Sequence, residues 1–78
     1  MHLDEKDLQC RMGKKQFIEQ IFARTLFQAS DGEITGLIYN IETEVVTVYS
    51  NGNPWRQCSV ACDSKMACIR DIAKAIDW

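Results

Sequence analysis

The sequence predicts an α+β fold in which a helix, a three-stranded antiparallel meander and a second helix follow one another, with both helices packed on one face of the sheet. Apolar residues recur with helical spacing over residues 14–29 and again after residue 64, while the segment between them is rich in β-branched and aromatic residues divided by turn signals. With 78 residues, the chain has room for one core, and we expect a single domain.

The composition indicates a folded protein whose partners are not held mainly by charge. Apolar residues make up 46% of the chain and charged residues 26%, which is ordinary for a globular domain. Nine basic against eleven acidic side chains leave a formal net charge of −2, which disfavours partners bound mainly through phosphate groups. Proteins or small molecules are therefore the expected partners, and nucleic acid is not favoured.

The start of the chain is charged where a secretion signal would be apolar, and the sequence contains no run of about 18 apolar residues. We therefore expect a cytoplasmic protein that neither spans a membrane nor is exported. In that compartment its four cysteines would remain reduced thiols.

Residues 1–13 are predicted to form a loosely ordered N-terminal arm ahead of a single αβββα domain at residues 14–78. Gly13 interrupts the helical spacing of the arm, and the pattern after it does not continue the one before it. Over residues 14–29 the apolar positions recur at intervals of three and four, which predicts one amphipathic helix. Its apolar face is expected to carry Phe17, Ile18, Ile21, Phe22, Leu26 and Ala29.

Turn residues divide the middle of the chain into three expected strands, at residues 33–41, 44–50 and 55–62. Gly32 ends the first helix, Glu42-Thr43 joins the first two strands, and Asn51-Gly52-Asn53-Pro54 joins the second and third. Asp63-Ser64 provides an N-cap for the second helix. The expected apolar face of that helix consists of Met66, Ile69, Ile72, Ala73 and Ile76.

Alternation along the strands predicts one sheet face buried under the helices and one face left open. The buried face is expected to carry Leu37, Tyr39, Ile41, Val46, Val48, Cys58, Val60 and Cys62. The open face is expected to carry Ile34, Ile38, Val45, Thr47, Tyr49 and Trp55. This second set is more apolar and aromatic than a solvated face requires, and such patches mark association surfaces.

A protein-binding surface on the open face is therefore the leading expectation. The partner bound there could be a second copy of the chain, which would give a homodimer. Its expected contact residues are Ile38, Val45, Thr47, Tyr49 and Trp55. Two plainer explanations stay open: β-propensity alone can select such residues, or the N-terminal arm can cover them. Trp78 either adds to this surface or folds back to cap the core.

The sequence offers no catalytic or metal-binding arrangement, so we expect neither an enzyme nor a cofactor. The cysteines lack the C-x-x-C spacing of zinc knuckles, and Cys58 and Cys62 on one strand would lie about 13 Å apart. That separation is too long for a shared metal or a disulfide without a bend. His2, the only histidine, lies at the extreme terminus, and the glycines form no phosphate-binding loop.

The element order resembles that of the double-stranded RNA-binding domain, and the part from Val45 through Asn51-Gly52 to Asp63-Ser64-Lys65 is similar to the C-terminal half of that family. The family grips phosphates through a Lys-Lys start to its second helix and glycines before it. Here Met66 and Ala61 depart from that pattern, and only Lys65 matches the start of the helix.

The resemblance makes nucleic-acid binding the alternative function, carried by basic side chains that would share one side of the domain. These are Lys14, Lys15, Lys65, Arg70 and Lys74. Small, slightly acidic domains of this kind also resemble accessory proteins of phages and mobile elements, some of which block host enzymes by binding them. We therefore expect a non-enzymatic protein-binding module that acts sterically through its apolar sheet face or through the acidic hairpin tip at residues 40–44.

Overall fold

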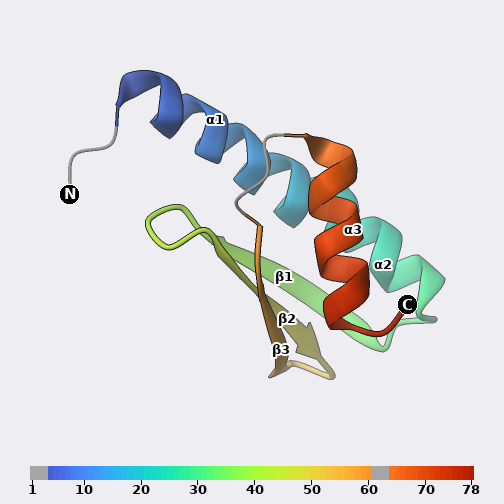
Figure 1. The fold of residues 1–78 in the computed structure, drawn as a ribbon. Helices are drawn as coiled ribbons and strands as arrows, with labels where there is room; N and C mark the ends of the chain where they lie inside the picture. The colour runs from blue at the N-terminus through green and yellow to red at the C-terminus, as the bar shows by residue number, and fades with distance from the viewer. Residues whose placement is uncertain (1–3, 61–63) are drawn as a thin grey trace.

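The helices and strands follow the predicted order, as a computed structural model that describes residues 4–60 and 64–78 shows. They are α1 (Glu5–Gln16), η1 (Phe17–Phe22), α2 (Ala23–Ala29), β1 (Ile34–Asn40), β2 (Val45–Ser50), β3 (Asn53–Ser59) and α3 (Lys65–Ala75). The strands form an antiparallel sheet of order β1-β2-β3. The segment from α1 to α2 and α3 lie on the same side of this sheet (Figure 1), which confirms the predicted α+β fold.

The first helix runs through Gly13, where the sequence predicts an interruption of the helical pattern. Helical structure begins at Glu5 and continues without a break to Ala29. A glycine inside a helix costs only about 1 kcal/mol relative to alanine. Side-chain bonds from Arg11 and Lys14, on either side of Gly13, to the loop between β1 and β2 offset this cost.

The middle of this helical segment is a π-helix, and its wider turns decide which residues face the core. The buried side chains Lys14, Ile18, Phe22 and Leu26 are each four residues apart. In an α-helix of 3.6 residues per turn such a row drifts around the axis, whereas the i→i+5 turns of η1 rotate it back. Ile21, predicted on the apolar face, is consequently 58% exposed, and Ala29 at the end of the row is exposed as well.

The hairpin between β2 and β3 is tighter than the sequence indicates. Asn51 and Gly52 have φ values of 54° and 82°, the positive values of a two-residue turn whose twist matches that of the strands. β3 therefore begins at Asn53 and includes Pro54, which the sequence places in the turn. Proline is tolerated there because β3 is an edge strand.

A bulge at the start of β1 corrects the expected position of Ile34. The register of β1 with β2 shifts between Ile34 and Gly36, so β1 has one extra residue at this point. The alternation of side chains between the two sheet faces is therefore reversed before the bulge relative to after it. Ile34 is therefore 3% exposed and belongs to the core, although strict alternation with Ile38 places it on the open face.

The core lies between the sheet and the helices. It consists of Ile18, Phe22, Leu26, Ile34, Leu37, Tyr39, Val46, Val48, Val60, Cys68, Ile72 and Ile76. Ile41 and Cys58, expected on the buried face, are partly buried against it, while Cys62 lies outside the described residues.

The second helix begins as predicted but faces the core with a slightly different row. Ser64 accepts a hydrogen bond from the Ala67 backbone N–H at 3.1 Å and so caps α3. Its core row is Cys68, Ile72 and Ile76, spaced by four residues. Met66, expected on the apolar face, lies about 200° around the helix from Cys68 and is 71% exposed.

We expect Gly13→Ala to stabilise the protein by about 0.5–1 kcal/mol, because a methyl group there meets no atom within 4 Å and alanine has less conformational freedom to lose on folding. Gly52→Ala is the matched control and should destabilise, because the φ of Gly52 is 82°. Urea unfolding of the three proteins measures both effects. A destabilised Gly13→Ala protein would contradict a continuous helix at this position.

Candidate functional site

The sheet face turned away from the helices carries no charged side chain. The register of the three strands arranges its residues in rows across the sheet: Asn40–Val45–Ser59, Ile38–Thr47–Gln57 and Gly36–Tyr49–Pro54. Trp55 occupies a second bulge at the end of this face, between the residues paired with Val48 and Tyr49. We call these residues together the open face.

The five predicted contact residues lie together on the open face. Ile38 is 50% exposed and Trp55 45% exposed, while Val45, Thr47 and Tyr49 are half-buried. Gln57, which the sequence analysis does not single out, donates a hydrogen bond to Thr47 Oγ1 at 3.3 Å in the central row. The sequence alone does not show that Gln57 lies opposite Thr47, because this pairing depends on the register between β2 and β3.

The bulge at Trp55 brings a cation to the rim of this face. The Arg56 guanidinium carbon lies 4.9 Å from the centre of the Trp55 ring, an arrangement in which the positive charge is attracted to the ring face. Residue Arg56 pairs with Val48, and thus belongs to the side of the sheet that faces the helices.

Other exposed hydrophobic residues lie away from the open face. Met12, Ile21, Phe27 and Met66 belong to the helical elements. Trp78 is 61% exposed, so it does not fold back to cap the core.

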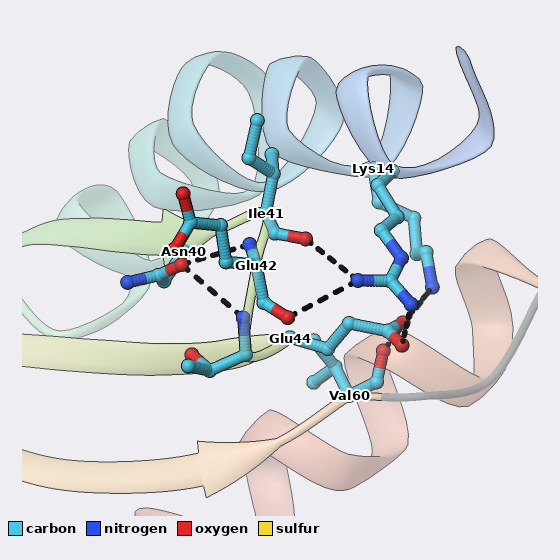
Figure 2. A network of polar contacts seen from close by, with 8 residues as sticks. Lys14, Asn40, Ile41, Glu42, Glu44 and Val60 are labelled. Carbon is cyan, nitrogen blue, oxygen red and sulfur yellow. Dashed lines mark hydrogen bonds and ion pairs between the residues drawn. The ribbon is translucent and has the colours of Figure 1, made fainter. Parts of the chain in front are cut away.

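A network of charged side chains joins α1 to the β1–β2 loop and to the end of β3 (Figure 2). Lys14, only 6% exposed, donates through Nζ to Glu44 Oε2 at 2.9 Å and to the Val60 carbonyl oxygen at 3.3 Å. Arg11 pairs with the other Glu44 oxygen at 3.0 Å and donates to the Ile41 carbonyl oxygen at 2.8 Å. One carboxylate thus serves two cations from successive turns of α1.

Glu44 occupies a backbone position that normally favours glycine. Its φ is 58°, and its backbone N–H donates to the Asn40 carbonyl oxygen at 2.8 Å while its carbonyl oxygen accepts from Val60 N–H at 2.9 Å. The Asn40 side chain supports the loop by accepting hydrogen bonds from the backbone N–H groups of Glu42 and Thr43 (Figure 2). The loop therefore presents this carboxylate to α1 at some cost in backbone strain.

The network holds its members in their charged forms. The hydrogen bond from Lys14, together with the charges of Lys14 and Arg11, lowers the pKa of Glu44 below its usual 4.5 despite burial, and the nearby Tyr39 hydroxyl adds to this. For Lys14, burial is the largest single influence and favours the neutral amine. The hydrogen bond to Glu44 and the electrostatic interactions with Tyr39, Glu44 and Cys68 together outweigh it, so the pKa of Lys14 is raised above 10.5.

The Tyr39 hydroxyl is the one fully buried side-chain oxygen or nitrogen that lacks a hydrogen-bond partner among the described residues. Burial raises the pKa of Tyr39 above 10.0, although Lys14 and Arg11 oppose the change, so the side chain is a neutral phenol at physiological pH. We attribute no chemistry to it, because its ring is part of the core.

Two of the five basic residues predicted for nucleic-acid binding have internal partners. Lys14 is held in the network, and Lys15 pairs with Glu19 at 2.7 Å and donates to the Tyr39 carbonyl oxygen at 3.2 Å. Lys65 lies over the ring of Phe17 at 5.3 Å and is exposed. The other two, Arg70 and Lys74, are exposed on α3.

Of the cysteines that the structure describes, Cys10 is exposed, Cys58 is partly buried and Cys68 belongs to the core. Burial raises the pKa of Cys58, with contributions from Asp71 and Cys68, which disfavours a reactive thiolate. Within residues 4–60 and 64–78, no three histidine, cysteine or acidic side chains gather in a way that could hold a metal ion. In the same ranges, no helix combines the length and apolar character needed to cross a membrane.

Comparison with protein-family models, with curated proteins and with solved structures gives no match to this chain. The function proposed below therefore rests on the geometry of the chain itself.

We expect Glu44→Gln to lower the free energy of unfolding by about 3 kcal/mol, because it removes the carboxylate charge that the largely buried Arg11 and Lys14 side chains share. Glu42→Gln is the matched control: it removes one carboxylate from the same loop at an exposed position and should change stability by no more than about 0.5 kcal/mol. Equal losses in the two variants, measured by urea unfolding, would show that the ion pairs do not stabilise the fold.

The pH dependence of stability should follow from the same residues. The lowered pKa of Glu44 contributes stability that is present above pH 4.5 and is lost as the pH falls below it, whereas the raised pKa of Lys14 contributes stability that is present below pH 10.5 and is lost as the pH rises above it. We therefore expect a plateau between these limits. In Glu44→Gln the acidic decline should be smaller, and an unchanged decline would assign it to other carboxylates.

Proposed function

We propose that this protein is a non-enzymatic protein-binding module and that its binding surface is the open face. The observation that carries the proposal is the exposure of Ile38 and Trp55 on a face with no charged side chain, in a chain where 26% of the residues are charged. Large apolar and aromatic side chains on such a face contribute much of the binding energy in protein interfaces.

A second copy of this chain is the partner that we propose for this face. The chain carries a net charge of −2, so two copies repel each other weakly at long range. Because the three rows of the open face carry no charged side chain and Arg56 lies only at its rim, two copies can bring these faces together, stacked or side by side, with few like charges opposite each other. Trp55, Tyr49 and Ile38 are the large side chains that this face offers to a partner.

The wider role that we propose is steric: a module of this type acts by occupying a surface, as expected for an accessory or inhibitor protein of a phage or mobile element in the cytoplasm. Nucleic-acid binding has less support. Of the five predicted basic residues, Lys14 and Lys15 are engaged internally, which leaves Lys65, Arg70 and Lys74 for phosphate contacts.

We expect replacement of Trp55 and Tyr49 together by alanine to abolish self-association while leaving helix content unchanged, because both side chains lie on the open face outside the core. Light scattering over a concentration series measures the mass of each protein, and circular dichroism measures helix content.

Trp78→Ala is the control for this experiment, since it removes an exposed tryptophan at the C-terminus, which lies on the helix side of the sheet (Figure 1). It should associate like the wild type. A wild-type protein that stays monomeric at every concentration, or a double variant that associates unchanged, overturns the proposal.

A further inference from the structure

The direction of the backbone groups in β3 follows from one hydrogen bond just beyond the end of the strand. In antiparallel pairs, residues alternately point both backbone groups toward one neighbouring strand and then toward the other. Val60 N–H donates to the Glu44 carbonyl oxygen, and these residues continue the β2–β3 register. Cys58, two residues before Val60, therefore faces β2, and Gln57 and Ser59 point their backbone groups outward.

The opposite edge of the sheet is closed by side chains of the long helical segment. Tyr39 in β1 points its backbone groups outward, where its N–H donates to Glu19 Oε2 at 2.8 Å and its carbonyl oxygen accepts from Lys15 Nζ at 3.2 Å. Arg11 Nη1 donates to the Ile41 carbonyl oxygen in the same way. These three side chains are four residues apart along the helix, so one helical row covers the β1 edge where β1 leads into the β1–β2 loop.

The edge of β3 has no such cover among the described residues. Every residue of β3 except Cys58 is exposed, and neither Gln57 nor Ser59 bonds through its backbone to a described side chain outside the β2–β3 ladder. Unpaired edge groups of this kind are a template for pairing with another strand.

We propose that β3 pairs antiparallel with β3 of a second copy, about a two-fold axis beside Cys58, so that the two sheets become one. This rests on the self-association proposed above and specifies its geometry as side by side. With the axis beside Cys58, Gln57 of each copy lies opposite the partner's Ser59, and the outward N–H and carbonyl groups of both residues are bonded.

The two edges of the sheet differ, and this difference favours a closed pair of copies over an extended chain of copies. Pairing of a β3 edge with a β1 edge would repeat without end and form fibres, but Lys15 and Glu19 occupy the backbone groups of Tyr39 in β1, and Arg11 occupies the Ile41 carbonyl oxygen beyond it. Like-with-like pairing of β3 meets no such side chains among the described residues, and it closes at two copies.

The side chains along β3 suit this pairing. Axes beside Arg56 would place two guanidinium groups opposite each other, whereas the axis beside Cys58 places Arg56 opposite the uncharged Val60. Trp55 then lies diagonally across from the partner's Ser59, a distance that an aromatic side chain can span. The seam thus joins the two open faces into one uncharged surface.

Amide hydrogen exchange followed by NMR tests the pairing without any variant. We expect the Gln57 and Ser59 amides to exchange at least about tenfold more slowly when the concentration is raised through the range in which the mass doubles. The amides of Arg56 and Cys58, which face β2, should be protected at every concentration. A dimer in which Gln57 and Ser59 stay unprotected overturns edge pairing and leaves the face-mediated association of the proposed function intact.

A proline substitution provides the second test. Gln57→Pro removes an N–H that points away from β2, so we expect the ladder and fold to persist while the dissociation constant of the dimer rises at least about tenfold. Gln57→Ala, which retains the N–H, is the matched control and should dimerise like the wild type. Should Gln57→Pro fold and dimerise unchanged, β3 is not the seam; should it unfold, the exchange experiment decides.

Discussion

The carboxylate of Glu44 is the contact on which the arrangement of helix and sheet depends. It binds Arg11 and Lys14 from the long helical segment, and the same residue accepts a backbone hydrogen bond from Val60 at the end of β3. Three parts of the chain that are distant in sequence therefore meet at one loop. A buried lysine needs a partner to remain charged, and the loop accepts a positive φ at Glu44 to provide one.

This contact fixes α1 along β1. As a result, side chains of the helical segment bind backbone groups at the β1 edge of the sheet but, among the described residues, not at the β3 edge. The helical row that begins with Arg11 continues through Lys15 and Glu19, whose side chains occupy the backbone groups of Tyr39. Native proteins often protect sheet edges with charged side chains, and here a helix supplies them to only one edge. The open face and the free β3 edge adjoin each other, which is why an association surface here combines apolar side chains with backbone donors.

The helical segment also shows how a local irregularity sets a global surface. An α-helix alone would drift away from the sheet over the length of the segment, and the π-helical turns of η1 keep Lys14, Ile18, Phe22 and Leu26 in one buried row. The cost is the exposure of Ile21, an apolar residue that periodicity assigns to the core. Such turns are set by the packing of the whole segment, so helical spacing alone cannot reveal them.

The sequence by itself determined the order of elements, the turn at Asn51-Gly52, the helix cap at Ser64 and most of the core, because each depends on local propensity or on a simple repeat of apolar positions. It also placed Ile38, Thr47 and Tyr49 on one sheet face. Only the tertiary structure decided the bulge that buries Ile34, the continuation of the first helix through Gly13, the pairing of Lys14 with Glu44 and the bond from Lys15 to the Tyr39 carbonyl oxygen. These features depend on contacts between residues about 16 to 46 positions apart, and the local spacing of apolar residues along the chain does not predict such contacts.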